Sequence, residues 1–93
     1  MDRAAIKEML IGSIKKFQAL SGDETPTLSE DTIPIGDCTG FDSQRAVEVL
    51  VDVESQLGIS LPGEANLFVS EDGRKALSIK AIVERIYKLV SKS

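Results

Sequence analysis

The chain has 93 residues, of which 42% are hydrophobic and only 4% aromatic, a composition that suits one small domain with an aliphatic core. Its 11 basic and 15 acidic residues give a net charge of −4, which argues against a nucleic-acid backbone as partner and for basic surfaces on other proteins. Because the sequence has no histidine and one cysteine, it excludes a Ser-His-Asp triad, His-based metal sites and an internal disulfide.

Helical periodicity predicts a first helix that begins after Asp2, as its N-cap, and runs to about Leu20. The side chains expected on its inward face are Ile6, Met9, Leu10, Ile14, Phe17 and Leu20. The opposite face carries basic residues and is expected to lie in solvent. The segment Ser21-Gly22-Asp23 is expected to end the helix.

A long loop is predicted from Glu24 to Phe41, because prolines and glycines recur there without a sustained period. A loop of this length in a small domain needs apolar contacts to hold it. The candidates are Leu28, Ile33, Ile35 and Phe41. The cysteine of this loop, Cys38, lies near Asp37 and Asp42, whose charges would raise the pKa of its thiol. We therefore expect a small, buried or half-buried apolar role for Cys38 rather than a reactive one.

An amphipathic helix is predicted over about Ser43 to Leu57, with Gly58 as a left-handed C-cap. Either Asp42 or Ser43 can be its N-cap. In both cases the Ser43 hydroxyl lies at the helix N-terminus, where amide groups and the helix dipole favour a negative charge such as a phosphate ester. The stripe expected to face the core comprises Ala46, Val47, Leu50, Val53 and Leu57.

The other side of this helix is expected to form an acidic ridge, which we define as Glu48 and Asp52, one turn apart. Arg45 and Ser55 share this side, and the expected apolar flanks of the ridge are Val49 and Val51. A solvated helix face is the simpler explanation for the two acidic residues taken alone.

After this helix, Ile59 and Leu61 are expected to return to the core, and Pro62 prevents the helix from resuming. A short helix is expected between Gly63 and Leu77, with Ala65, Leu67, Phe68 and Val69 as candidates, followed by a turn at residues 71–73.

Ser78 is the expected N-cap of a last helix. Its inward stripe is predicted to hold Ile79, Ile82, Val83, Ile86, Leu89 and Val90.

The central residues resemble a known family. Asp42-Ser43, Val47-Glu48-Val49, Glu54, Leu57-Gly58-Ile59 and Leu61-Pro62 are similar to the second helix and following turn of acyl carrier proteins. The resemblance implies an all-α fold: a four-helix bundle of three long helices and one short third helix, with a long first loop, in a single domain over residues 1–93. It implies that Ser43 is the attachment point of 4′-phosphopantetheine, and that Asp42 helps the modifying transferase engage it.

The same resemblance assigns further roles. Partner recognition falls to Gln44, Glu48, Val51 and Asp52, and the acyl pocket is lined by Val47, Val53, Leu67 and Phe68. Gln44 stands where the family usually has leucine, and Arg45 where it often has an acidic or polar residue. These departures, with a longer segment between Pro62 and Ser78, indicate a specialised carrier.

We therefore expect a non-enzymatic carrier that holds an acyl group as a thioester for fatty-acid, polyketide or related biosynthesis. Its expected partners are a phosphopantetheinyl transferase and acyl-loading and acyl-processing enzymes with basic docking surfaces. Two alternatives remain: an aminoacyl or peptidyl carrier, and an unmodified helical interaction module in which Ser43 only caps the helix.

We also expect a cytoplasmic monomer that binds neither nucleic acid nor membrane. The first residues have no basic segment followed by an apolar run. The sequence also has no stretch of about eighteen apolar residues. No acid–base constellation points to catalysis by this chain alone.

Overall fold

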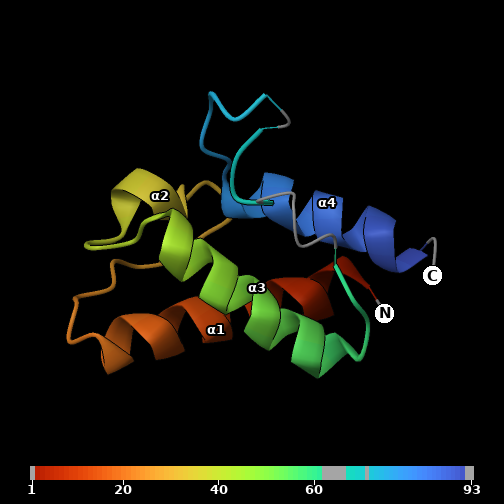
Figure 1. Cartoon of the computed structure of the whole chain (residues 1–93), viewed down its shortest axis with the longest axis horizontal. Coiled ribbons are helices and arrows are strands. Elements are labelled where there is room, and N and C mark those ends of the chain that lie inside the picture. The colour runs from red at the N-terminus through yellow and green to blue at the C-terminus, as the bar shows by residue number, and fades with distance from the viewer. Residues whose placement is uncertain (1, 62–66, 71, 92–93) are drawn as a thin grey trace.

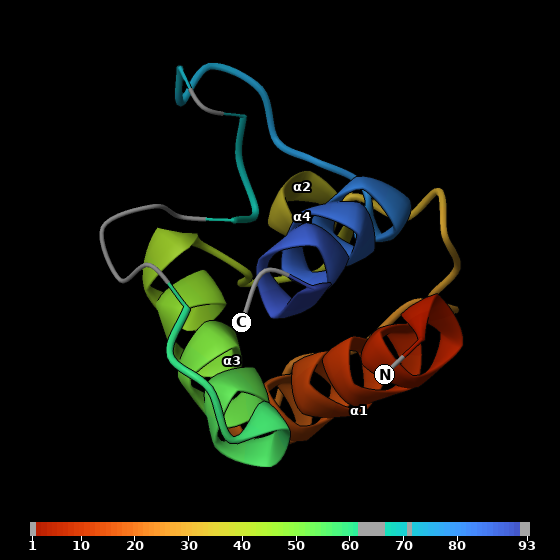
Figure 2. The ribbon, with the colours of Figure 1, turned by 90° about the vertical axis from the view of Figure 1, so that its right-hand side faces the viewer.

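The computed structural model describes residues 2–61, 67–70 and 72–91. These residues form an all-α globule with the helices α1 (Arg3–Leu20), α2 (Pro34–Asp37), α3 (Ser43–Leu57) and α4 (Ile79–Ser91). α1 packs against both α3 and α4, and Figure 2 shows the three long helices arranged around one shared interior. Within the described part of the chain, no helix has the length and apolar character needed to cross a membrane.

α1 confirms the predicted first helix. The Asp2 side chain caps it by accepting a hydrogen bond from the Ala5 amide at 2.9 Å, and Ile6, Leu10 and Ile14 are fully buried. Leu20 was predicted to widen this face, and that prediction is wrong, because Leu20 is 72% exposed. At 100° per residue, Leu20 points about 120° away from Ile14. The inward position of the last turn belongs instead to Gln18, four residues after Ile14.

α3 has the predicted bounds and ends at Gly58, whose φ of +71° is left-handed and whose amide donates to Glu54 O at 2.9 Å. Of the stripe predicted to face the core, Leu57 is partly buried and three residues are buried: Ala46, Leu50 and Val53. Val47 was also predicted to face the core, and that prediction is wrong, because Val47 is 49% exposed whereas Val49 is fully buried. Val49 lies three residues after Ala46 and four before Val53, so it falls inside the stripe that Val47 borders.

α4 confirms the predicted last helix. The Ser78 hydroxyl accepts a hydrogen bond from the Ala81 amide at 3.3 Å and so acts as the N-cap. The inward residues are buried or partly buried as predicted: Ile79, Ile82, Val83, Ile86, Leu89 and Val90.

The connection between α3 and α4 differs from the prediction. No helix forms over residues 67–70 and 72–77, and the candidate Ala65, like Pro62 and Glu71, lies outside the described residues. Leu67 and Phe68 lie in a turn, and Val69 pairs with Ala76 in an isolated antiparallel bridge. The backbone bonds Leu77 N to Phe68 O and Ser70 N to Lys75 O, both 2.8 Å, hold this pairing. Arg85 of α4 also donates to the Val69 carbonyl.

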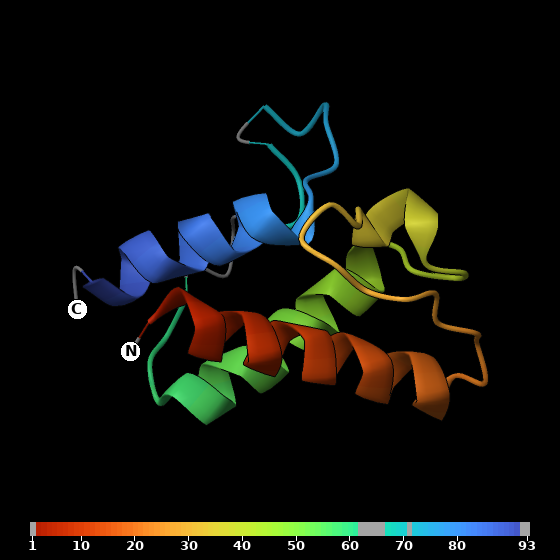
Figure 3. The same ribbon diagram turned by 180° about the vertical axis from the view of Figure 1, so that it is seen from behind.

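The short helix of the described chain instead lies within the long first loop. α2 is a single distorted turn that starts at Pro34, with Asp37 N donating to Ile33 O at 2.9 Å. Asp37 also accepts from the Ile33 amide through its own carboxylate at 2.7 Å. Figure 3 shows this loop running from the end of α1 past α2 toward the first turn of α3. Three of its four predicted apolar contacts form, since Phe41 is buried and Leu28 and Ile35 pack against the core, whereas Ile33 does not belong to this cluster.

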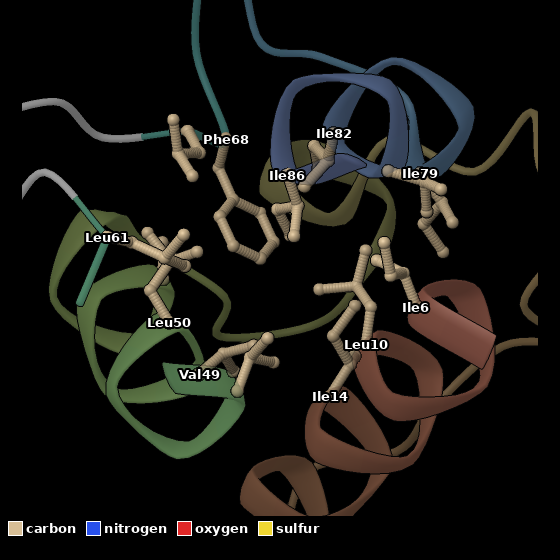
Figure 4. Packing of buried hydrophobic residues seen from close by; sticks show 14 of the residues in the cluster. Ile6, Leu10, Ile14, Val49, Leu50, Leu61, Phe68, Ile79, Ile82 and Ile86 are labelled. Carbon is tan, nitrogen blue, oxygen red and sulfur yellow. The ribbon is translucent and has the colours of Figure 1, made fainter. Parts of the chain in front are cut away.

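The interior is aliphatic apart from two phenylalanines. Figure 4 shows side chains of α1, α3 and α4 converging, with Phe68 and Leu61 reaching inward from the connection that follows α3. The ring of Phe68 is fully buried and lies 5.4 Å from the ring of Phe41, centroid to centroid. Through this ring contact, the connection after α3 packs against Phe41, the residue that directly precedes Asp42 and Ser43.

Candidate functional site

Ser43 is the first residue of α3, and its side chain is exposed. The N-cap is Asp42, whose Oδ1 accepts a hydrogen bond from the Arg45 amide at 2.9 Å. The choice that the sequence left open is thus resolved in favour of Asp42. The Ser43 hydroxyl makes no hydrogen bond within the described residues.

Arg45, in the first turn of α3, does not lie on an exposed acidic face as predicted. Its guanidinium turns toward the end of α1, where Nη1 donates to Gln18 Oε1 at 2.6 Å and to Asp23 Oδ2 at 2.8 Å. The Arg45 side chain is only 15% exposed. Because Asp23 pairs with its charge, Arg45 does not add an unpaired positive charge beside Ser43.

Gln18 completes this arrangement from α1. Its side chain is fully buried, and its Nε2 donates to Thr39 O at 2.8 Å and to Glu24 O at 3.2 Å. Every polar atom of the buried amide therefore has a partner, and the end of α1 is bonded to both ends of the first loop. We call Gln18, Asp23 and Arg45 the loop clamp.

Gly40 packs directly against the loop clamp. Its φ is +71°, in the region that favours glycine, and a Cβ built on it would lie 2.6 Å from Asp23 Oδ2 and 3.3 Å from Arg45 Nη1. No side chain fits there unless the ion pair moves. The backbone that leads to Asp42 and Ser43 is thus held against the end of α1 by close contact as well as by hydrogen bonds.

The exposed face of α3 differs in part from the predicted recognition surface. Gln44, Glu48 and Val51 are exposed, as expected of partner-facing residues, and the exposed Val47 joins them. We call these four residues the exposed α3 face. Because Val47 and Val51 follow Ser43 at intervals of four, they form a row that runs down the helix from the serine.

Asp52, the other half of the acidic ridge, is mostly turned away from solvent. Its carboxylate accepts from Lys16 Nζ of α1 and from Gln56 Nε2, each at 3.1 Å. Hydrogen bonding from Ser13 lowers the pKa of the Asp52 carboxyl, Lys16 and Gln56 lower it further, and partial burial opposes them. Asp52 therefore joins α3 to α1, and Glu48 is the exposed member of the acidic ridge.

Three of the four predicted acyl-pocket residues lie together in the interior. Val53, Leu67 and Phe68 belong to the one buried cluster, whereas Val47 lies on the surface. Phe68 reaches into the space between α3 and α4 (Figure 4). The interior that these three residues share is apolar, but Val47 does not line it.

Cys38 is buried, as predicted. Burial raises the pKa of its thiol, and the negative charge of Asp37 raises it further, so the unreactive thiol is the dominant form at neutral pH. Within the described ranges, no group of three or more acidic or cysteine side chains could hold a metal ion.

Comparison of the chain with models of known protein families, with curated proteins and with solved structures finds no match. Sequence reasoning found Ser43 and Asp42 but missed the loop clamp. The one signal for it was Gln18, a polar residue that continues the four-residue series of Ile6, Leu10 and Ile14.

Proposed function

We propose that the chain is an acyl carrier protein in which Ser43 bears a 4′-phosphopantetheine arm. The observation that carries the proposal is the exposed Ser43 hydroxyl, which begins a helix but has no role in capping it, because Asp42 is the cap. In the reaction, the hydroxyl oxygen attacks the phosphopantetheine phosphorus of coenzyme A. The new O–P bond replaces the bond to the adenosine bisphosphate, which leaves, and the serine proton passes to a base of the transferase.

The first turn of α3 suits the phosphate of such an arm. The Arg45 and Ala46 amides already bond to Asp42, at 2.9 and 3.0 Å, whereas the amides of Ser43 and Gln44 have no protein acceptor among the described residues. Free amides at a helix N-terminus favour a nearby phosphate. The chain thus offers both an attachment oxygen and an environment that stabilises the phosphodiester. When bound, the arm supplies a terminal thiol for a thioester.

The exposed α3 face supports recognition by partner enzymes. Glu48 offers a negative charge and Val47 and Val51 offer apolar contact next to the serine, which suits basic docking surfaces with a small apolar centre. Binding of this kind is weak and weakens further with salt. Glu48→Lys is expected to lower partner affinity at low salt, and an unchanged affinity would argue against this docking mode.

The apolar side chains around Val53 and Phe68 favour a cargo of the fatty-acid or polyketide kind, because an aminoacyl group that entered this interior would bury a polar amine without a partner. A monomeric state and a cytoplasmic location belong to the same proposal. The main rival is an unmodified interaction module, and the observation in its favour is that Val47 and Val51 lie exposed on α3, where they could contact a partner without any group on Ser43.

The experiment that separates the two is the intact mass after incubation with coenzyme A and a broad-specificity phosphopantetheinyl transferase. Ser43→Ala is the test variant, and Ser78→Ala is the matched control, because Ser78 is the cap serine of α4. We expect one phosphopantetheine on the wild type and on Ser78→Ala, and none on Ser43→Ala. If the wild type is not labelled, the assay is repeated with Gln44→Leu. An unlabelled Gln44→Leu variant would contradict the carrier proposal.

A further inference from the structure

Arg45 is connected to the serine-bearing loop by two routes. Its backbone amide donates to Oδ1 of Asp42, the residue before Ser43. Its guanidinium reaches the end of α1, where Gln18 in turn donates to Thr39 O. The four-residue segment from Thr39 to Asp42 is therefore held at both of its ends by contacts that pass through Arg45.

The bonds of the loop clamp are short, charged and shielded from solvent. The Arg45 and Asp23 side chains are 15% and 27% exposed, and their N–O distance is 2.8 Å. A charged pair in such a place is less screened by salt than a surface pair, and removal of one partner leaves the other without its counter-charge. By contrast, the Arg3 and Glu84 pair at the other end of the molecule is mostly exposed.

Asp23 is itself fixed to α1. Its amide donates to Gln18 O at 2.9 Å, and Gly22 N donates to Ala19 O at 3.1 Å, so the turn that ends α1 carries the carboxylate back over the helix. The Arg45 charge is thus anchored to the end of α1. Loss of either Asp23 or Arg45 removes the ion pair against which Gly40 packs.

We propose that Arg45 is a positioning residue for the modification of Ser43: the loop clamp holds the Thr39–Asp42 backbone so that the Ser43 hydroxyl meets the transferase in a fixed geometry. This inference rests on the proposed function. Arg45 acts through Asp42 and the loop and does not touch the reacting atoms, because its guanidinium points toward α1. Misplacement of a reacting group by about 1 Å can cost up to about 10²-fold in rate, so a loosened loop is expected to slow the transfer.

The first test is the steady-state rate of phosphopantetheine transfer to the full chain, as kcat/KM for the carrier. The variants are Arg45→Gln, Asp23→Asn and the two combined, with Arg3→Gln as matched control. We expect each clamp variant to lower kcat/KM by about tenfold or more. The double variant should be no worse than the more impaired single variant, because both remove the same contact. Arg3→Gln is expected to remain at the wild-type value.

Arg45→Lys is the conservative variant. All the clamp bonds leave from one nitrogen of Arg45, so a lysine ammonium can reproduce part of the contact, and its rate should lie between those of Arg45→Gln and the wild type. A role in global stability alone predicts a different pattern: lower melting temperatures, with kcat/KM unchanged at temperatures at which every variant is folded.

Two outcomes overturn the inference while the proposed function stands. One is a labelled wild type with Arg45→Gln within twofold of it. The other is a slow Arg45→Gln beside a normal Asp23→Asn, which would mean that Arg45 contacts the transferase directly. Hydrogen exchange gives a second readout that needs no transferase: the Cys38 and Phe41 amides, bonded within the loop, should exchange faster in both clamp variants, with α4 unchanged.

Failure of the proposed function has a different signature. The wild type would then remain unlabelled in both the native and the Gln44→Leu backgrounds, and the positioning role would fall with it. If Arg45→Gln does not fold, Asp23→Asn decides, because its carboxylate is more exposed and asparagine retains the size of the side chain.

Discussion

Two long connections border α3, and they are held in place by different forces. The connection before it, residues 21–42, is fixed by the loop clamp, in which buried or half-buried polar groups of Gln18, Asp23 and Arg45 bond to each other and to the loop backbone. The described part of the connection after it contacts the core through apolar side chains, with Leu61, Leu67 and Phe68 all buried, and its polar bonds are a local backbone pairing and the bond from Arg85 to Val69 O. Both meet where the rings of Phe41 and Phe68 lie in contact.

The difference matters because hydrogen bonds and ion pairs are directional, whereas apolar burial is not. Under the proposed carrier function, polar groups of fixed geometry would hold the serine in one position for the transferase. Apolar contacts can adjust their packing at lower cost, which the same proposal would require of a segment beside an acyl chain. Substitutions in the two connections can test this contrast.

Phe68→Ala should have the largest effect on stability. The ring is fully buried in the interior between α3 and α4, and deletion of a buried phenylalanine side chain typically costs about 3–5 kcal/mol. Denaturant unfolding would measure the change. A loss below about 1 kcal/mol would mean that the second connection contributes little to the core, and the contrast would fail.

Gly40→Ala and Gly73→Ala form a matched pair, one in each connection. Both glycines have a left-handed φ, +71° and +73°, but a Cβ at Gly40 would collide with Asp23, whereas a Cβ at Gly73 meets nothing within 4 Å. We expect a cost of about 1 kcal/mol at Gly73 from the backbone alone and about 2–3 kcal/mol at Gly40, where the ion pair must also move. Equal losses in thermal unfolding would show that the loop clamp does not constrain the first connection.

Ser43→Ala and Ser78→Ala compare the residues at which each connection meets its helix. The Ser78 hydroxyl accepts from the Ala81 amide, so its removal should cost about 1 kcal/mol. Ser43 follows a cap already supplied by Asp42, so its removal should change the free energy of unfolding by less than about 0.5 kcal/mol. A larger loss in the free energy of unfolding for Ser43→Ala than for Ser78→Ala, measured by denaturant unfolding, would indicate that Ser43 has a structural role.

Asp52→Asn should have the smallest effect, a small loss of stability above about pH 4 that disappears in acid. Because the folded pKa of Asp52 lies below the unfolded value, its stabilisation is present above about pH 4 and is lost as the pH falls through the folded pKa. The variant should therefore show a shallower loss of stability below pH 4. Unfolding measured against pH would test this, and a wild-type slope in the variant would contradict the role of Asp52 in joining α3 to α1.

The sequence predicted the long helices closely because their signals are local. Asp2, Gly58 and Ser78 mark helix ends through contacts within one turn, and apolar side chains at helical spacing mark the faces. The exchange of Val47 and Val49 shows the limit of this reasoning: when valines follow one another so closely, only the neighbouring helices determine which one is buried.

The site was predicted in part for the same reason. Ser43 and Asp42 are recognisable from adjacent residues, whereas the partner of Arg45 is 22 positions away in the chain. Such a contact depends on how α1 ends and where the first loop crosses it. In the connection after α3, the closely spaced apolar residues Leu67, Phe68 and Val69 suggested a helix. Backbone pairing between Val69 and Ala76, seven positions apart, forms there instead.

The most direct test of the account is to find which residue carries the phosphopantetheine. After labelling by the transferase, the intact chain can be fragmented in the mass spectrometer and the added mass located along the sequence. We expect fragments that end at Asp42 to be unmodified and fragments that extend through Ser43 to carry one phosphopantetheine. An unmodified chain in both the native and the Gln44→Leu forms, or the added mass on any other residue, would contradict the account.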